Sequence, residues 1–446
     1  MYDVISCCAW DRCVSAEQRL NACWASSPLN VAVFACTWNI ATLDPPQDEK
    51  IVKELLQSQQ KEVPDIYTIG LQEVSSKPHH YLRDTILDDP WTDWICRELA
   101  PQGYIKVKDI RLQGLVLLLL VKLEHVPFVR NIHTNYTRTG LGGLWGNKGG
   151  VSIRFGLYGA SVCIVNCHLE AHLEGWAQRN KDYVNIINDQ YFEACSTKGI
   201  LDHDYVIWLG DLNYRIADLK TEDVKEVIAR NELHILKYKD QLCLSKDAGD
   251  VFKDFSEGDL TFPPTYKLDF GTMTYDSSAK QRKPGWCDRI LWKVNKGRES
   301  RRHLHMELDR YDSHRTVLWS DHLPVSADLR LKVEKTDVKP PVNFRHMEPW
   351  KIGQDSQCIY FVHIDTQTSS WDWIALYKIG FRNPNNYETY VWAVKDGENM
   401  QHGCRVVFES FYLPKDTSCQ YVLGYYSSLM ESLLGVSEPF QILNQE

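Results

Sequence analysis

The sequence predicts an α/β domain followed by a small all-β sandwich, and three observations support this prediction. Apolar, β-branched segments alternate with segments of helical spacing over the larger, first part of the chain. The composition then changes at residues 335–342, where Pro340 and Pro341 indicate a linker. After it, short alternating segments are separated by turn residues, as is typical of a sandwich. A chain of 446 residues is long enough for one large domain and a smaller one.

In the larger domain, each expected strand is a short apolar run that stops at a glycine or a polar residue. We expect strands at residues 31–36, 65–69, 105–107, 112–123, 151–155, 161–165 and 206–209, with another strand leading on from 282–291. Between them, apolar residues recur at helical spacing, as Ile51, Leu55 and Leu56 do. Helices are therefore expected at residues 49–60, within 79–100, and at 178–191, 221–233 and 249–256.

A glycine-rich segment at residues 139–150 interrupts this pattern. Its six glycines do not favour packing in a core, but they allow tight turns and close approach of the backbone. We expect a loop that presents Asn147 and Lys148 between the glycines.

The last part of the chain reads as five short strands. They are expected at residues 359–364, 373–378, 389–394, 406–411 and 420–426. The predicted organisation is an N-terminal extension of unknown role at 1–29, the α/β domain at 30–333, a linker at 334–342 and the sandwich at 343–446.

Composition limits the classes of function. The net charge of −9 and the pI of about 5.9 argue against general nucleic-acid binding, which requires a basic surface. The fourteen cysteines form no CxxC pair, which favours free thiols in a reducing, cytoplasmic compartment. The longest apolar run, 115–121, is too short to span a bilayer, so membrane contact is expected to be peripheral.

The segment 206–216 carries the clearest chemical pattern. An apolar strand ends at Gly210, and Asp211, Asn213 and Arg215 follow at a spacing of two residues. In an extended chain this spacing sends all three side chains to one side. A carboxylate can take a proton from water, an amide can position the water, and a guanidinium can hold an anion. Taken alone, a solvated turn at the end of a strand explains the segment as well.

Other polar residues follow or adjoin the expected strands in the same way. If the strands pack in sheets with their ends at one edge, these side chains meet in one cleft. Each of them alone has an ordinary structural explanation, and only their joint occurrence favours a site. The set comprises Asn39, Glu73, His168, Asp211, Asn213, Asp288, Asp321 and His322.

These residue types suit the hydrolysis of a phosphate. Glu73 and Asn39 offer oxygen ligands to a hard divalent cation, which predicts Mg²⁺ rather than zinc. Asp211 is the candidate base, and Asp288 can orient His322 and stabilise its protonated form. Among the cations, Lys148 and Arg215 can hold phosphate oxygens. 

The order of the motifs resembles that of the inositol polyphosphate 5-phosphatases. These belong to the endonuclease/exonuclease/phosphatase superfamily, whose fold is a two-sheet α/β sandwich. The combination of GDLNYRI, PPTYK and WCDRIL distinguishes them from the nuclease branch. The resemblance covers residues 30–333, in blocks at 37–39, 70–73, 146–150, 166–169, 210–216, 263–267, 286–291 and 320–325.

The resemblance implies a role for each matching residue. Glu73 is the magnesium ligand with Asn39 assisting, Asp211 is the base, and Asn213 positions the nucleophilic water. The phosphate that is cleaved contacts His168 and Arg215, and Asp288 pairs with His322 beside it. Asp321 is implied to lie near the metal or the leaving group. Tyr266 and Lys267 are implied to bind the neighbouring 4-phosphate, where Lys283 adds positive charge. Asn147 and Lys148 are further implied contacts of the substrate.

The last part of the chain has a resemblance of its own. Residues 371–380, WDWIALYKIG, resemble the SKICH domain, an immunoglobulin-like sandwich that places its hosts at membranes. We expect several of its tryptophans to lie in the core and the surface for a protein partner to lie elsewhere.

The predicted function is magnesium-dependent removal of the 5-phosphate from inositol headgroups. Phosphatidylinositol 4,5-bisphosphate and phosphatidylinositol 3,4,5-trisphosphate are the expected substrates, and soluble inositol tris- and tetrakisphosphates are further ones. The expected location is peripheral, at the plasma membrane or the endoplasmic reticulum. Two alternatives stay open: a nuclease of the same superfamily, and a catalytically silent adaptor that acts through the sandwich domain.

Overall fold

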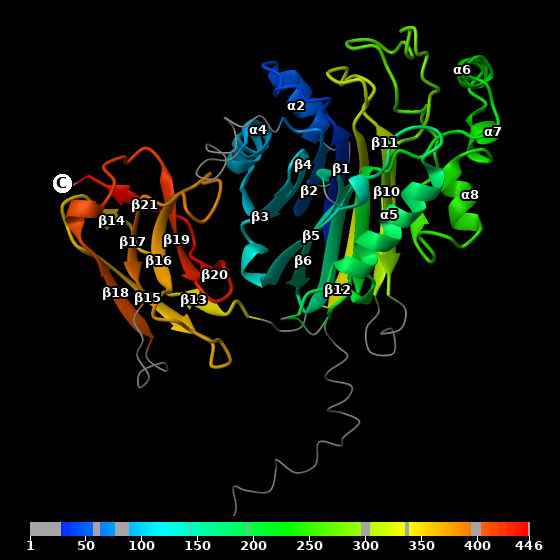
Figure 1. Ribbon diagram of the computed structural model, residues 1–446. Coiled ribbons are helices and arrows are strands. Elements are labelled where there is room, and N and C mark those ends of the chain that lie inside the picture. Colours follow the sequence, from blue (N-terminus) through cyan, green and yellow to red (C-terminus); the bar gives the residue numbers. More distant parts are fainter. Residues whose placement is uncertain are drawn as a thin grey trace, which may run out of the picture.

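The computed structural model describes residues 28–56, 63–75, 89–143, 145–193, 195, 197–295, 304–334, 339–393 and 403–444. These residues form an α/β domain and a smaller all-β domain that lie side by side (Figure 1). In the α/β domain, two six-stranded sheets pack face to face. The predicted fold class, a two-sheet α/β sandwich followed by a small all-β sandwich, is confirmed.

The first sheet has the strand order β11-β12-β1-β2-β4-β3. In it, β1 and β2 are parallel, whereas the other neighbours are antiparallel. Its strands are β1 (Pro28–Asn39), β2 (Ile66–Gln72), β3 (Tyr104–Leu112), β4 (Leu115–Lys122), β11 (His305–Ser313) and β12 (Val325–Glu334).

The second sheet has the order β5-β6-β7-β8-β10-β9, and its parallel pair is β7 with β8. Its strands are β5 (Val129–Gly140), β6 (Trp145–Leu157), β7 (Ala160–His168), β8 (Tyr205–Asp211), β9 (Ser256–Glu257) and β10 (Asp288–Val294).

Side-chain alternation explains why the central strands are apolar along their whole length. On β4, Leu117 and Leu119 face the second sheet, whereas Leu118 and Leu120 face the helices on the other side. Both faces are buried, so the strand reads as a continuous apolar run rather than as an alternating one. The core between the sheets and the two outer layers follow from this arrangement.

Helices cover the outer faces of both sheets. On the first sheet lie α2 (Glu49–Leu56) and α4 (Pro90–Leu99), and on the second α5 (Trp176–Asp189) and α8 (Gln241–Asp247). Beside α8 lie the short helices α6 (Thr221–Ala229) and α7 (Leu233–Lys237) (Figure 1). None of the helices in the described part of the chain is long and apolar enough to cross a bilayer.

Strand register brings the polar ends of the strands to one edge. Asn39 at the end of β1 pairs with Gln72 at the end of β2. In the second sheet, Asp211 pairs with His168 on one side and with Asp288 on the other. The convergence predicted for these residues follows from two parallel strand pairs whose carboxyl ends lie at the same edge.

The glycine-rich segment is mostly strand, so the predicted loop at 139–150 is wrong in its extent. Among the described residues of this segment, the chain turns at Leu141–Gly143, and β6 begins at Trp145. The close backbone approach is confirmed at Gly149, which has φ of +150°. A Cβ there would lie 2.0 Å from the carbonyl oxygen of Thr137 on β5, so only glycine allows the two strands to pair at this point.

The helix predicted at 249–256 is also wrong, because the helix is α8, which begins at Gln241. Asp240 caps it by accepting a hydrogen bond from the amide of Cys243. Residues 249–256 form turns and the start of β9, and Val251, Phe252 and Phe255 insert into the core beneath the second sheet. Their spacing resembled one face of a helix because each residue fills a core position.

Most other expected elements are present with shifted ends. The helix expected at 221–233 divides into α6 and α7 near Asn231, whose φ of +58° is incompatible with a continuous helix. Parts of several predictions lie outside the described residues, namely 1–27, 57–60, 79–88, 335–338 and 394.

The C-terminal domain is the predicted all-β sandwich, with nine strands among its described residues. One sheet contains β13 (Val342–Phe344), β15 (Ser356–Val362) and β18 (Cys404–Phe408). The other has the order β14-β21-β19-β16-β17, with β20 beside β19. Its strands are β14 (Trp350–Lys351), β16 (Trp373–Lys378), β17 (Thr389–Trp392), β19 (Gln420–Ser427), β20 (Ser432–Val436) and β21 (Phe440–Leu443).

The expectation that several tryptophans fill this core is wrong. Only Trp350 is buried among the four tryptophans described in the domain, whereas Trp371 is 68% exposed and Trp392 is 50% exposed. The cause is Asp372, which is fully buried and accepts hydrogen bonds from the Tyr425 hydroxyl and the Ser428 amide. Because side chains alternate, an inward Asp372 directs its neighbours outward.

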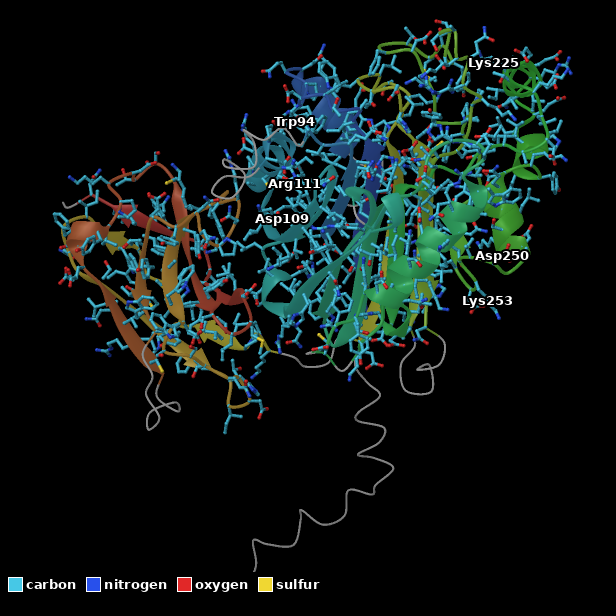
Figure 2. The ribbon with its side chains drawn as sticks, viewed as in Figure 1. Trp94, Asp109, Arg111, Lys225, Asp250 and Lys253 are labelled. Carbon is cyan, nitrogen blue, oxygen red and sulfur yellow. The ribbon has the colours of Figure 1, made fainter. Side chains whose placement is uncertain are left out.

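The two domains share an interface along β3, the edge strand of the first sheet. The Lys106 amide donates a 2.8 Å hydrogen bond to the carbonyl oxygen of Arg382, whose guanidinium pairs with Asp93 at 2.5 Å. Lys108 pairs with Glu431 at 2.9 Å. Asp109 and Arg111, labelled in Figure 2, lie on the side of the first domain that faces the second. The apolar core continues across this interface through Tyr377, Phe381, Val422 and Leu433.

Candidate active site

A row of paired residues across the second sheet forms the base of the site. Gly149, His168, Asp211 and Asp288 occupy matching positions on β6, β7, β8 and β10. Three polar side chains therefore stand next to one another at the sheet edge. All three side chains are buried.

Asp211 is the centre of this row. Its Oδ1 accepts a 3.0 Å hydrogen bond from the Asn213 amide, and its Oδ2 accepts one of 3.0 Å from Asn39 Nδ2. The same oxygen lies 3.2 Å from His168 Nε2. Burial opposes ionisation, but His168, His322 and Lys148 outweigh it and hold the pKa of Asp211 well below its usual range. The carboxylate is therefore ionised at every physiological pH.

Asp288 and His322 form a second buried pair. His322 Nδ1 lies 2.9 Å from Asp288 Oδ2, and the Thr265 hydroxyl donates to the same oxygen at 2.7 Å. Burial lowers the pKa of His322, but Asp288 and then Asp211 overcome this and raise it to about 9. Burial raises the pKa of Asp288, with the His322 cation opposing the shift. His322 consequently carries a proton at neutral pH.

Asn213 and Arg215 follow β8, but not in the extended geometry that their spacing predicts. Asn213 has φ of +56°, which turns the chain out of β8, and its Nδ2 donates to the Leu169 carbonyl oxygen at 3.1 Å. Arg215 Nη2 donates to Asn213 Oδ1 at 2.5 Å. The Arg215 guanidinium lies 4.1 Å from the centre of the Tyr266 ring, which is 4.6 Å from the His322 ring. Together these side chains form one wall beside the carboxylates.

Glu73 and Asn39 lie at the end of the first sheet and face the same row. Asn39 Nδ2 donates to Glu73 Oε1 at 3.2 Å, and Glu73 Oε1 is 4.0 Å from His168 Nε2. The Glu73 side chain is 42% exposed, and its φ of +58° turns it away from the strand direction. A partly exposed carboxylate beside the ionised Asp211 fits a hard divalent cation. Asn39 uses its amide nitrogen to position Glu73, while its oxygen accepts from the Ala41 amide.

Lys148 adds a cation to the row, as the sequence predicts. Its ammonium contacts His168 Nε2. Burial lowers the pKa of Lys148, and the nearby carboxylates of Asp211 and Glu73 oppose this. Burial and then Lys148 lower the pKa of His168, so this histidine is neutral while His322 is charged. Asn147, the neighbour of Lys148, is exposed.

The residues expected at a neighbouring phosphate are already engaged with the protein. Lys267 forms an ion pair with Asp321, so two of the predicted site residues bind each other. Lys283 Nζ donates to the carbonyl oxygen of Ile216 at 3.1 Å, one residue beyond Arg215. Tyr266 stays beside Arg215.

Several residues of the site were missed in the sequence, although they lie in its motifs. The Trp38 indole donates to the His322 carbonyl oxygen at 3.1 Å, and the Ser320 hydroxyl donates to the Asn39 carbonyl oxygen at 2.7 Å. Both bonds tie the loop that carries His322 to the end of the first sheet. Gln72 Nε2 donates to Asn166 Oδ1 at 2.7 Å and so joins the two sheets. For Gln72 and Asn166, the signal available in the sequence was an amide side chain inside an apolar strand.

Arg179 on α5 was missed because nothing near it in the sequence indicates its partners. The side chain is fully buried, and it donates to the carbonyl oxygens of Glu170 and His172 in the loop after β7. Its Nη2 also donates to Gln241 Oε1 at 2.6 Å, the same oxygen that accepts a 3.0 Å bond from the Arg215 amide. Arg179 therefore links the loop after His168 to the main chain at Arg215.

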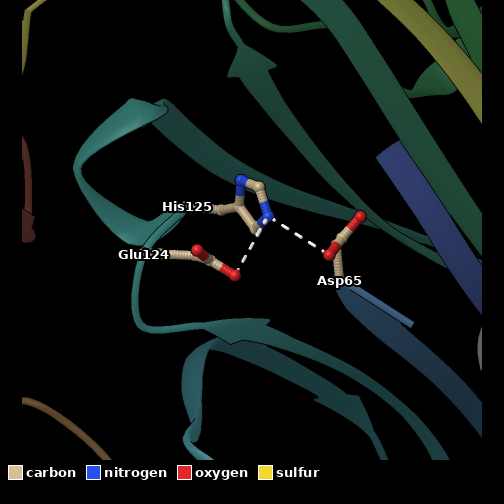
Figure 3. Close-up of side chains that lie close together, drawn as sticks. All are labelled: Asp65, Glu124 and His125. Atoms are coloured by element: carbon tan, nitrogen blue, oxygen red, sulfur yellow. Dashed lines mark ion pairs between the residues drawn. The ribbon is translucent and has the colours of Figure 1, made fainter. Parts of the chain in front are cut away.

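A second group of acidic and histidine side chains lies away from this site. His125 Nε2 is 3.2 Å from Asp65 and 3.9 Å from Glu124 (Figure 3). However, Lys122 Nζ lies 3.4 Å from Asp65 and 3.9 Å from Glu124, so a cation of the protein already balances these carboxylates. The arrangement is that of a structural ion-pair network rather than of a metal centre.

Comparison with known proteins identifies both domains. A family model described as endonuclease/exonuclease/phosphatase family 2 matches residues 36–328, and the SKICH domain model matches residues 342–442. The solved inositol polyphosphate 5-phosphatase domain of SPsynaptojanin, in complex with inositol 1,4-bisphosphate and calcium ion, has a TM-score of 0.62. It is 32% identical and is aligned over 72% of this chain and 90% of its own.

Curated relatives match over both domains. Phosphatidylinositol 4,5-bisphosphate 5-phosphatase A of Mus musculus is 41% identical over 94% of this chain, which spans only 43% of the length of that relative. Inositol polyphosphate 5-phosphatase K of Mus musculus is 37% identical over 92% of this chain and 90% of its own length. The sequence predicts a likeness to this second protein, also called the skeletal muscle and kidney enriched inositol phosphatase, and the prediction is confirmed. The chain belongs to the inositol polyphosphate 5-phosphatases of the endonuclease/exonuclease/phosphatase family and carries a C-terminal SKICH domain.

Proposed function

We propose that this protein is a magnesium-dependent phosphatase that removes the 5-phosphate from inositol headgroups. Its substrates are phosphatidylinositol 4,5-bisphosphate and phosphatidylinositol 3,4,5-trisphosphate, with soluble inositol 1,4,5-trisphosphate and 1,3,4,5-tetrakisphosphate as further ones. The observation that carries the proposal is the buried, ionised Asp211, held between His168 and the Asp288–His322 pair.

The relatives support the choice of substrate. The relatives named above are 5-phosphatases of phosphatidylinositol 4,5-bisphosphate and of inositol polyphosphates. The ligand of the SPsynaptojanin domain, inositol 1,4-bisphosphate, is the molecule left when the 5-phosphate of inositol 1,4,5-trisphosphate is removed.

In the proposed reaction, water attacks the 5-phosphorus in line with the departing inositol oxygen. Asp211 accepts a hydrogen bond from this water, and Asn213 orients it. A new O–P bond forms as the P–O bond to inositol breaks. The proton of the water passes to Asp211, and the departing inositol oxygen takes up a proton from solvent water. The low pKa of Asp211 makes it a weak base, which is sufficient because phosphoryl transfer depends chiefly on positioning and charge stabilisation.

Cationic side chains stabilise the phosphate in this scheme. Arg215 and His168 contact the phosphate that is cleaved, and protonated His322 neutralises charge that develops on its oxygens. Burial and then Lys148 lower the pKa of His168, and the neutral imidazole carries one N–H that can donate to the phosphate. Tyr266 binds the neighbouring 4-phosphate, which also draws Lys267 away from Asp321.

Glu73 would hold the magnesium ion, with Asn39 positioning the carboxylate. When bound, the ion supplies Lewis-acid stabilisation of charge on the phosphate. Asp321 lies near this ion or the leaving group, and Lys283 and Asn147 complete the rim that faces the headgroup.

The C-terminal domain brings this cleft to its substrate. We assign it the binding of a protein partner, which places the enzyme peripherally at the plasma membrane or the endoplasmic reticulum. The fixed interface with β3 supports this role, because a partner held by one domain then orients the other.

The decisive experiment measures phosphate release from short-chain phosphatidylinositol 4,5-bisphosphate and, in parallel, from phosphatidylinositol 4-phosphate. Release from the first substrate alone is expected, with loss of at least about a hundredfold in the Asp211→Asn variant and on chelation of magnesium. Asp65→Asn, in the ion-pair network at the other end of β2, is the matched control and should keep full activity. Equal release from both lipids would contradict specificity for the 5-phosphate. Cleavage of an oligonucleotide at a similar rate would favour a nuclease, and no release from any inositol phosphate would favour an adaptor.

A further inference from the structure

The face of the β16–β17–β19 sheet that packs on the α/β domain also carries an unusual concentration of exposed aromatic rings. Among its members, Trp371 is 68% exposed, Trp392 50%, Tyr390 40% and Tyr387 39%. Monomeric proteins rarely leave a contiguous apolar patch of this kind uncovered, and such a patch indicates a binding surface. We call this surface the aromatic face and define it as Trp371, Trp373, Tyr387, Tyr390, Trp392 and Tyr426.

The six rings form one connected group. Trp373 stacks on Tyr426 at 4.6 Å and lies 5.4 Å from Tyr387 and 6.0 Å from Tyr390. Tyr390 meets Trp392 at 5.5 Å, and Trp392 meets Trp371 at 5.9 Å. All of them come from β16, β17, β19 and the turns that flank these strands.

The aromatic face is held rigidly from beneath. Trp373 and Tyr426 pack on the apolar core that continues into the α/β domain. Trp371 and Trp373 are directed outward by the buried Asp372 between them, whose carboxylate accepts hydrogen bonds from Tyr425 and Ser428. Rigid aromatic side chains lose little conformational entropy on binding, so such a surface is organised in advance for a ligand.

The shape of the face suits proline rings. Trp371 stands at 81° to Trp392, and Trp392 stands at 88° to Tyr390. Rings that meet at right angles form ridges with slots between them instead of a flat platform. Proline-rich segments in the polyproline II conformation dock into aromatic slots of this type and are already extended before they bind.

The charge of the face suits a cationic ligand. Glu388, between Tyr387 and Tyr390 in the sequence, is exposed and forms no ion pair with the described residues. Two described cations that precede Glu388 in the sequence are engaged elsewhere, since Lys378 pairs with Asp416 and Arg382 with Asp93. A face with a free carboxylate and open aromatic rings attracts a guanidinium, by charge and by cation–π contact. An anionic bilayer would instead require lysine and arginine around the aromatic rings.

We propose that the aromatic face binds a protein segment in the polyproline II conformation that carries prolines and at least one arginine. The inference rests on the proposed role of the C-terminal domain in binding a protein partner, and it names the surface and the chemistry of that partner. The aromatic face is separate from the catalytic residues, so the proposed function and this inference can be contradicted independently.

The test uses the full chain and a fluorescent peptide of repeated Arg-Pro-Pro triplets, with binding followed by fluorescence anisotropy. Trp371→Ala and Trp392→Ala should each weaken binding by at least about tenfold, as expected for central aromatic contacts. Glu388→Gln should weaken the arginine peptide but leave a Gln-Pro-Pro peptide unchanged. Phe411→Ala is the matched control, because Phe411 is 87% exposed on the same domain but lies outside the aromatic face.

Three results would overturn the proposal. The first is that the unaltered chain does not bind the peptide. The second is that Phe411→Ala weakens peptide binding as much as the tryptophan variants do. The third is that the chain binds vesicles of anionic lipid through Trp371 and Trp392 but does not bind the peptide. Release of phosphate from phosphatidylinositol 4,5-bisphosphate is measured on the same variants. Normal release with lost peptide binding separates this surface from catalysis, whereas lost release in the unaltered chain would count against the proposed function alone.

Discussion

Asp211 and Asp288 lie directly opposite each other on the neighbouring antiparallel strands β8 and β10. Together with His322 they bring two carboxylate oxygens and an imidazole nitrogen within 4.8 Å of one another, and all three residues are buried. Two buried carboxylates at this distance repel each other unless a cation lies between them. Protonated His322 is that cation, so the strand register itself determines the charge state of the site.

This relationship predicts the alkaline limit of activity. The pKa of His322 is raised from the ordinary value of 6.5 to about 9, chiefly by Asp288 against the effect of burial. Activity that depends on the imidazolium should therefore fall as the pH rises through about 9. Asp288→Asn should move this limb to lower pH by at least about one unit, because one carboxylate partner becomes neutral. The measurement is the pH dependence of kcat/KM, with the histidine titration followed by NMR.

The same pair has a consequence for stability. A raised pKa in the folded state means that the His322–Asp288 interaction stabilises the fold fully below about pH 6.5 and that this contribution is lost as the pH rises through about 9. Asp288→Asn should remove that part of the pH dependence of the unfolding free energy. Asp65→Asn serves as the control. If this variant changed the unfolding free energy at alkaline pH as much as Asp288→Asn does, the assignment to the His322–Asp288 pair would be contradicted.

Removal of the proposed metal ligand, Glu73, should affect metal binding before it affects the fold. Glu73→Gln keeps the hydrogen bond from Asn39 but removes the charge that would hold the ion. We expect the magnesium concentration for half-maximal activity to rise about tenfold or more, and the rise in Tm on addition of magnesium to shrink. Thermal unfolding with and without magnesium measures this directly.

Glu124→Gln is the matched variant for this test, because Glu124 belongs to the ion-pair network of Figure 3. If Glu124→Gln reduced the magnesium response as much as Glu73→Gln, the metal would bind elsewhere.

Gln241 should prove essential for the position of Arg215. Its Oε1 accepts from both Arg179 and the Arg215 amide, so Gln241→Leu leaves two buried donors without an acceptor. The expected cost is about 1–3 kcal/mol of unfolding free energy for each donor that stays unsatisfied. The KM should also rise, since the main chain at Arg215 loses its anchor while Asp211 is untouched. Urea unfolding and steady-state kinetics measure the two effects.

Gln241→Glu separates these effects from a general loss of stability. The glutamate retains an acceptor oxygen at the same place and adds a charge beside the Arg179 guanidinium. The KM of Gln241→Glu should therefore return most of the way to the value of the unaltered protein. A KM that stayed as high as in Gln241→Leu would count against the positioning role.

The continuous core between the domains predicts that they unfold together. Phe381 is buried, stacks on Tyr377 at 4.1 Å, and belongs to the core that both domains share. Phe381→Ala should cost about 3–5 kcal/mol and lower the unfolding temperature of the whole chain. Calorimetry should show one transition in the unaltered protein. Phe411→Ala, on the exposed side of the same domain, should change the stability by less than about 0.5 kcal/mol.

The strand ends and the candidate site residues that follow them could be predicted because their signals are local. Apolar runs that stop at Asn39, Glu73, His168 and Asp211 appear in the sequence as strands followed by polar residues. The link from Arg179 through Gln241 to Arg215 could not be predicted, because it joins residues 62 and 26 positions apart with no repeating pattern. Long-range hydrogen bonds of this kind depend on how α5 and α8 pack on the second sheet.

The sequence by itself determined the domain order, the family and the residues of the candidate site, because each depends on local periodicity or on short motifs. Tertiary structure alone decided how these residues are paired. It placed Asp211 opposite Asp288, joined Lys267 to Asp321, and turned the tryptophans beside Asp372 outward. The physical reason is that strand register and the burial of a charged side chain are set by partners distant in the chain. The free energies of strand pairing and of burying a charged side chain depend on partners that come together only when the sheets form.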